Sequence, residues 1–237
     1  MTPPLRLPAI ILTALAIFCT YTLLDRLFRA HRRTLYLTAA TITLWFLLTG
    51  TLANRGFFTN FATLPPHLLF ALLLPALVFA LFSLTSSTLP ETLRETPLPW
   101  LIAFQTFRIV VELILWRGYK AGAVPVQMTF EGRNLDILIG LTAPIAAFII
   151  YRTQSRIFGI LWNIAGLASL LNIATIAILS MPTPLRRFMN NPPNVLLAHF
   201  PFIYLPAILV PAGYIAHFLS IRQLLQKRQL PHTEAVT

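Results

Sequence analysis

The chain contains, from residue 100 to residue 116, the stretch Trp100-Leu-Ile-Ala-Phe-Gln105-Thr-Phe-Arg108-Ile-Val-Val-Glu112-Leu-Ile-Leu-Trp116. At 1.5 Å per residue its two tryptophans lie about 24 Å apart, which is typical of anchors at the two interfaces of a bilayer. Gln105, Arg108 and Glu112 are spaced i, i+3 and i+7, so a helix places them on one face. A charged residue at the centre of such a helix costs roughly 2.5–3.5 kcal/mol. This polar face is therefore predicted to contact protein, water or a ligand, and not lipid.

The composition of the whole chain indicates a membrane protein. Of its 237 residues, 57% are hydrophobic and only 11% are charged, whereas soluble domains carry about 25% charged residues. The net charge of +11 does not indicate nucleic-acid binding, because most of the 18 Lys and Arg residues lie in short segments between apolar runs. Contact with the lipid bilayer and its anionic lipids is the expected role of these charges. The single Cys19 excludes an internal disulfide and a metal site built from cysteines.

Seven apolar windows reach the length that a helix needs to cross a bilayer, about 20 residues and as few as 17. The fold class is therefore predicted as an all-α polytopic transmembrane helical bundle, formed by residues 1–237 as one integral membrane domain. The spans are expected near residues 7–24, 34–53, 66–88, 99–116, 135–151, 157–180 and 195–220.

The basic residues predict the orientation of these spans. One side of the membrane receives ten of them, namely Arg26, Arg29, Arg32, Arg33, Arg94, Arg152, Arg156, Arg222, Lys227 and Arg228. The other side receives seven, namely Arg6, Arg55, Arg117, Lys120, Arg133, Arg186 and Arg187. Because basic loops stay in the cytoplasm, the N-terminus is predicted outside and the C-terminus inside.

The segment from Gly118 to Asn134 joins the polar fourth span to the fifth and mixes apolar residues, turn formers and charges. Connections of this length are often functional. Its apolar content predicts that it is ordered and packs over the bundle, with Met128 and Phe130 turned inward.

Further polar residues follow this segment. In the predicted orientation Glu112 lies one turn outward of Arg108, so Glu112, Glu131, Arg133 and Asp136 would converge on one cavity open to the outside. Helix capping is the alternative explanation of Asp136 and its neighbour Asn134. Asn134 is a good N-cap, and a carboxylate in the first helical turn is favoured by the helix dipole.

Asn163, on the sixth span, is the remaining candidate residue for a polar site. It shares a face with Gly159, Gly166 and Leu170, which is a close-packing stripe where a hydrogen bond between helices is expected. No metal site is predicted. His199 and His217 fall near opposite ends of the predicted seventh span, and His67 with His199 lacks carboxylate neighbours.

Two stretches carry a resemblance to a known family. They are Gln105-Thr-Phe-Arg108-Ile-Val-Val-Glu112 and Met128-Thr-Phe-Glu131-Gly-Arg133-Asn134-Leu-Asp136-Ile-Leu, and Trp162-Asn163-Ile-Ala-Gly166-Leu fits the same pattern. Over roughly its C-terminal two-thirds the chain resembles a family of uncharacterised bacterial multi-span inner-membrane proteins. The resemblance implies a bacterial inner (plasma) membrane and implies no activity or cofactor.

Three classes of function remain open at this point. The first is binding or transport of a small solute or lipid-like ligand, in which Arg108 recognises an anionic group and Glu112 carries a proton. The second is a non-catalytic sensor or assembly component, in which the Arg108–Glu112 pair is a structural salt bridge. The third is an intramembrane enzyme that acts on lipid or quinone with Glu112 or Glu131 as acid or base, although no nucleophile–base pair can be placed.

Overall fold

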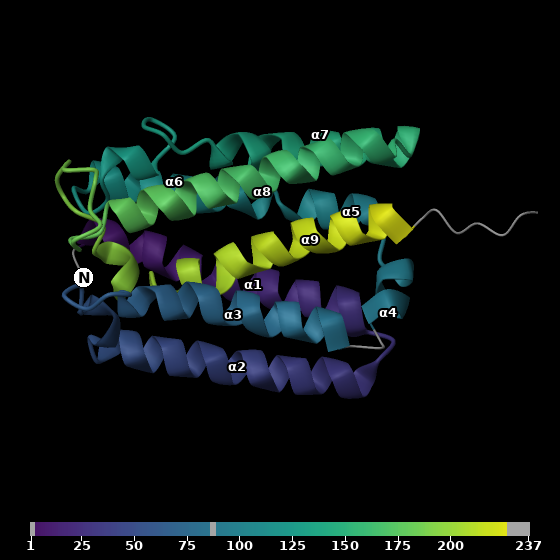
Figure 1. Ribbon diagram of the computed structural model, residues 1–237, viewed down its shortest axis with the longest axis horizontal. Helices are drawn as coiled ribbons and strands as arrows, with labels where there is room; N and C mark the ends of the chain where they lie inside the picture. Colours follow the sequence, from purple (N-terminus) through teal and green to yellow (C-terminus); the bar gives the residue numbers. More distant parts are fainter. Residues whose placement is uncertain (1–2, 86–88, 227–237) are drawn as a thin grey trace, which may run out of the picture.

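The computed structural model describes residues 3–85 and 89–226, and within that part of the chain the regular structure is helical (Figure 1). Its α-helices are α1 (Pro3–Phe28), α2 (Arg32–Asn54), α3 (His67–Thr85), α4 (Leu89–Glu95), α5 (Leu98–Phe104), α6 (Phe107–Lys120), α7 (Asp136–Thr153), α8 (Arg156–Leu179) and α9 (Val210–Gln226). The same described residues also contain three 3₁₀ turns and one π-helical turn, namely η1 (Phe57–Thr59), η2 (Val126–Met128), η3 (Leu196–Ala198) and the π turn η4 (Leu205–Leu209).

Among residues 3–85 and 89–226, six helical segments are long and apolar enough to cross a membrane, namely α1, α2, the pair α5–α6, α7, α8 and the continuous segment from η4 through α9. Helix α3 has 19 residues and a shorter apolar stretch, His67–Phe79. The predicted all-α bundle with about seven spans is confirmed.

Apart from the short α4, the helices run along the long axis of the molecule, with α2 at one flank and α7 at the other (Figure 1). The connections around residues 55–66, 121–135 and 180–204 gather at one end, here called the loop end. The turn at residues 29–31, α4 and the end of α9 gather at the opposite end, here called the tail end. Helix α9 lies inside the bundle, where it packs against α3, α5 and α8.

The fourth predicted span is not one regular helix. Helix α5 ends at Phe104 and α6 begins at Phe107. Between them the amide of Gln105 bonds to the carbonyl of Ile102, and the amide of Arg108 bonds to the carbonyl of Gln105, each at 3.1 Å. These bonds reach back three residues instead of four, so the helix tightens locally.

The hydroxyl of Thr106 contributes to this change by donating to the Ala103 carbonyl at 2.7 Å. Such a bond competes with the helical ladder and often bends a helix.

The seventh helical segment begins later than the sequence predicts. A span near residues 195–220 is expected, but regular α-helix starts at Val210, after the π turn that begins at Leu205. The stretch before it contains Pro201, whose missing N–H and fixed ring disfavour helix. The segment then continues to Gln226, six residues beyond the predicted end.

Candidate functional site

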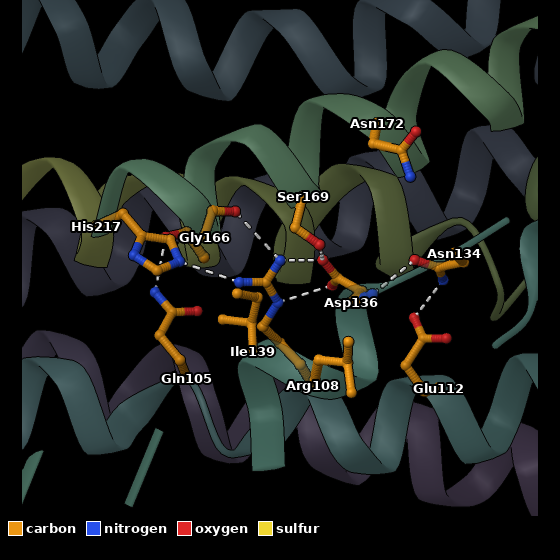
Figure 2. Close-up of polar contacts among 12 residues, drawn as sticks. Gln105, Arg108, Glu112, Asn134, Asp136, Ile139, Gly166, Ser169, Asn172 and His217 are labelled. Carbon is orange, nitrogen blue, oxygen red and sulfur yellow. Dashed lines mark hydrogen bonds and ion pairs between the residues drawn. The ribbon is translucent and has the colours of Figure 1, made fainter. Parts of the chain in front are cut away.

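A buried arginine at the α5–α6 break forms the centre of a polar cluster (Figure 2). The side chain of Arg108 is 1% exposed. Its Nε donates to Oδ2 of Asp136 at 2.7 Å, and its Nη2 donates to Oδ1 of the same carboxylate. This two-point geometry is the strongest arrangement that an arginine and a carboxylate adopt. Arg108 of α6 is thereby joined to the first turn of α7.

Asp136 is held on its other sides as well. Ser169 of α8 donates its hydroxyl proton to Oδ1 of Asp136 at 2.7 Å. The backbone amide of Asp136 donates to Oδ1 of Asn134 at 3.0 Å. The N-cap of α7 is Leu135, so Asn134 is not the N-cap that the sequence predicts, although its side chain bonds to the first residue of the helix. The Asp136 carboxylate serves as the counter-ion of Arg108.

His217 of α9 completes the environment of the guanidinium. Its Nε2 lies 3.0 Å from Nη1 of Arg108, and its Nδ1 lies 2.8 Å from Oδ1 of Asn163. Arginine can only donate, so Nε2 accepts and the proton of the ring sits on Nδ1, from which it is donated to Asn163. The contacts therefore define a neutral histidine with one tautomer.

A glycine makes this contact possible. A methyl group at Gly166 would overlap the imidazole of His217, so α8 and α9 can approach closely only without a side chain there. The interhelical hydrogen bond expected for Asn163 is present, and its partner is His217.

The other two polar residues of the α5–α6 face flank Arg108. Gln105 donates through Nε2 to the carbonyl of Gly213 at 3.0 Å, while its Oε1 finds no partner among residues 3–85 and 89–226. Glu112 accepts a 2.6 Å hydrogen bond from Nδ2 of Asn134 on Oε1, and its Oε2 likewise lacks a partner in the described chain.

Burial of Arg108 and Glu112 predicts that they pair with each other or with another polar helix residue, and the structure shows the second alternative for Arg108. Both side chains are buried on one face of the helix, as the spacing predicts. However, Arg108 pairs with Asp136 of α7 and not with Glu112. A carboxylate on the neighbouring helix can meet the planar guanidinium at two points, and this geometry prevails over the i, i+4 neighbour.

The expected convergence on a cavity open to the outside is wrong for Glu131 and Arg133, which are both exposed. Glu131 accepts hydrogen bonds from Nε1 of Trp116 at 2.7 Å and from Nζ of Lys120 at 2.9 Å, and these bonds lower the pKa of its carboxyl. The guanidinium of Arg133 lies over the ring of Phe188, 5.3 Å from its centre.

The connection that carries Glu131 packs over the loop end of the bundle. Met128 is 1% exposed, and Gln127 donates to the hydroxyl of Ser180 at 2.9 Å. Phe130 is half-buried and stacks on Trp116. The inward direction predicted for Met128 is confirmed, whereas Phe130 lies against the end of α6.

Sequence reasoning missed Ser169 and His217. Ser169 lies three residues after Gly166, so the small-residue face of α8 already pointed to it. His217 was placed near the end of its span, but the segment runs from Leu205 to Gln226, which puts His217 well inside it. In residues 3–85 and 89–226 no three His, Cys, Asp or Glu side chains come together as a metal site would need.

The family model described as "Domain of unknown function (DUF8737)" matches residues 65–225. This is more than half of the chain, so the chain belongs to that family. The match extends from the residues before α3 into α9 and includes the whole polar cluster. No curated protein and no solved structure matches the chain. The resemblance to an uncharacterised family is confirmed at this level, and the description of the family assigns no activity.

Proposed function

We propose that this member of the DUF8737 family binds a small or lipid-like anion inside its helical bundle and moves it across the membrane. Arg108 is the anion-binding residue, and Gln105, Asp136 and Asn163 shape the site around it. The observation that carries the proposal is the break between α5 and α6, which lies directly beside Arg108 in the middle of a span.

Broken membrane helices support this function for a physical reason. Irregular backbone in the hydrocarbon region is tolerated where protein or a cavity surrounds it, and transporters build substrate sites at such breaks. Here both helices that flank the break pack against α7, and α5 also packs against α9. The π turn from Leu205 to Leu209 is a second irregularity, and π-helical turns often occur at functional sites.

Asp136 occupies the position that an anionic ligand would take. Its carboxylate presents two oxygens to Arg108 in the way that a substrate carboxylate or phosphate would. In the proposed cycle the ligand replaces Asp136 on the guanidinium, and the bundle returns to the present arrangement after release. The neutral His217 and the carbonyl of Gly166 keep Arg108 in place during this exchange.

The second candidate function is a non-catalytic sensor or assembly component with structural charges. The observation that favours it is that Nε, Nη1 and Nη2 of Arg108 all have partners within the bundle. In that case the cluster fixes the register of α6, α7, α8 and α9, and no ligand displaces Asp136.

Thermal unfolding of the purified protein separates the two candidates. The probes are acetate, lactate, succinate, inorganic phosphate and a long-chain fatty acid, each added in excess. A ligand at about 100 times its Kd stabilises the folded state by roughly 2.7 kcal/mol. We expect such a shift for the wild type and none for Arg108→Gln/Asp136→Asn, while the surface variant Arg133→Gln behaves as the wild type. The anion that binds is then followed in proteoliposomes.

A flat response of the wild type to every probe, together with a lower stability of Arg108→Gln/Asp136→Asn, would favour the structural role.

The proposed localisation is the bacterial inner membrane, with the N-terminus outside and the C-terminus in the cytoplasm. The basic turn around Arg32 and Arg33 lies at the tail end, where α9 also ends. Lys227 and Arg228, which contribute to the charge difference, lie outside the described residues. Reporter fusions after Arg33 and after Lys227 should both report cytoplasm.

A further inference from the structure

We propose that Glu112 is a proton-binding site, and that its carboxyl group is protonated in the resting protein. The site is distinct from the Arg108–Asp136 pair, and the inference holds whether or not Arg108 binds an anion. It rests on the surroundings of one side chain that lies within a membrane-spanning segment.

The first observation is that Glu112 has no counter-ion. Among the described residues Arg108 is the one buried lysine or arginine. Its guanidinium is bound on one edge by both oxygens of Asp136 and on the other side by Nε2 of His217. His217 is neutral in this arrangement, so the positive charge of Arg108 is already balanced by Asp136.

The second observation is the weak solvation of the carboxyl group. Glu112 is 1% exposed and receives one hydrogen bond, from the neutral amide of Asn134. Its Oε2 is buried without a partner in the described chain. A carboxylate in such a place would be a buried charge with one neutral donor, and burying an ion in this way costs several kcal/mol. Binding a proton removes that charge.

Within the described chain, the elements packed against α6, namely α1, α7 and η2, offer no other charge to offset an ionised Glu112. Helix α7 brings Asp136, which is itself negative. Helix α1 carries no charged residue between Leu7 and Leu24, and Arg6 is exposed at the loop end. The η2 turn, from Val126 to Met128, contains none.

The hydrogen-bond partner of Glu112 lies close to the surface of the loop end, although it is itself buried. Asn134 is hydrogen-bonded to Glu112, and its neighbours in the chain, Arg133 and Leu135, are both exposed. The same amide group also holds the first turn of α7, because its Oδ1 accepts the backbone amide of Asp136. Loss of the proton from Glu112 therefore acts, through Asn134, on the helix end that carries the partner of Arg108.

Infrared spectroscopy of the purified full chain, in a detergent without ester carbonyl groups, tests this inference. At neutral pH we expect a carbonyl stretching band from a protonated carboxyl group, and the band should shift in D₂O. It should shift when the protein is labelled with ¹³C-glutamate and stay in place with ¹³C-aspartate. Glu112→Gln should lose the band completely, whereas the exposed control Glu131→Gln should keep it.

A wild-type spectrum without the band at neutral pH overturns the proposal, as does a band that shifts with labelled aspartate. The labelled wild type decides the question even if Glu112→Gln does not fold. The test contains no anion, so the failure of the proposed transport function would leave its result unchanged.

Discussion

Helix α2 and the segment from Leu205 to Gln226 are both apolar and long enough to cross a membrane, yet they have different surroundings. In the most apolar 18 residues of each segment, 17% are buried inside the bundle for α2 and 61% for the segment from Leu205 to Gln226. The two segments also differ in where their polar side chains find hydrogen-bond partners, and this accounts for the difference in burial. In α2 the exposed Thr41 bonds to the carbonyl of Leu37 in its own helix. Within the described chain the side chains of α2 make few hydrogen bonds to other elements, namely those of Thr43 with Tyr21 of α1 and of Trp45 with the carbonyl of Ala207.

The two larger polar side chains His217 and Gln223 of α9 find partners outside their own helix, whereas Ser220 bonds to the carbonyl of Ala216 in the same helix. His217 binds Asn163 of α8, and Gln223 donates to the carbonyls of Leu93 and Thr96 at 2.8 and 2.7 Å. A threonine that satisfies its hydroxyl within its own helix can face lipid, whereas histidine and glutamine need a neighbouring helix. The comparison teaches that the location of a span in the bundle follows from where its polar groups can be satisfied.

The largest expected effect tests the polar half of this comparison. Arg108→Leu leaves the Asp136 carboxylate buried without its counter-ion, which costs roughly 3–5 kcal/mol. We expect a marked loss of thermal stability and yield, and a recovery in Arg108→Leu/Asp136→Leu. Thermal unfolding in detergent measures both. An equally severe loss in the double variant would mean that Arg108 does not act through this pair.

Apolar packing gives the next largest contrast. Leu209, in the π turn, is 1% exposed, whereas Leu47 of α2 is 63% exposed. Leu209→Ala should cost about 2–5 kcal/mol through the cavity it creates, while Leu47→Ala should stay within about 0.5 kcal/mol. The two variants differ in burial and not in chemistry. If Leu209→Ala and Leu47→Ala unfolded at similar temperatures, the difference in burial between the two segments would be contradicted.

A smaller effect is expected at the contact between α8 and α9. Gly166→Ala introduces a methyl group against the imidazole of His217 and should cost about 1–3 kcal/mol by overpacking. The matched control is Ala165→Leu, because Ala165 is exposed on the neighbouring face of the same helix. Thermal unfolding compares them. If Ala165→Leu lowered the stability and Gly166→Ala did not, then Ala165, and not Gly166, would be the residue of α8 that packs against another helix.

The smallest effect concerns the exposed carboxylate at the loop end. The hydrogen bonds from Trp116 and Lys120 favour the ionised form of Glu131 and lower its pKa below 4.5. These hydrogen bonds therefore stabilise the folded protein at a pH above the ordinary pKa of a glutamate. The stabilisation is lost as the pH falls through the lowered pKa of Glu131. The NMR shift of the Trp116 indole N–H should follow this titration, and Lys120→Met should move its midpoint upward. If Lys120→Met left the midpoint of the Glu131 titration unchanged, the hydrogen bond between Lys120 and Glu131 would be contradicted.

Much of the candidate site could be predicted from spacing within single helices. The i, i+3, i+7 pattern placed Gln105, Arg108 and Glu112 on one buried face, and the stripe around Asn163 predicted a bond between helices. The identity of the partners could not be predicted in this way. Asp136 and His217 reach Arg108 from other helices, at sequence separations of 28 and 109 residues.

The sequence by itself determined the membrane class, the number of spans to within one and the helix that carries the buried charges. These properties depend on composition and periodicity, which are local. Only the tertiary structure decided the pairing of Arg108 with Asp136, the isolation of Glu112 and the break at Gln105 and Thr106. Each of these depends on how several helices pack together, because a buried polar group takes the partner whose geometry and charge satisfy it best.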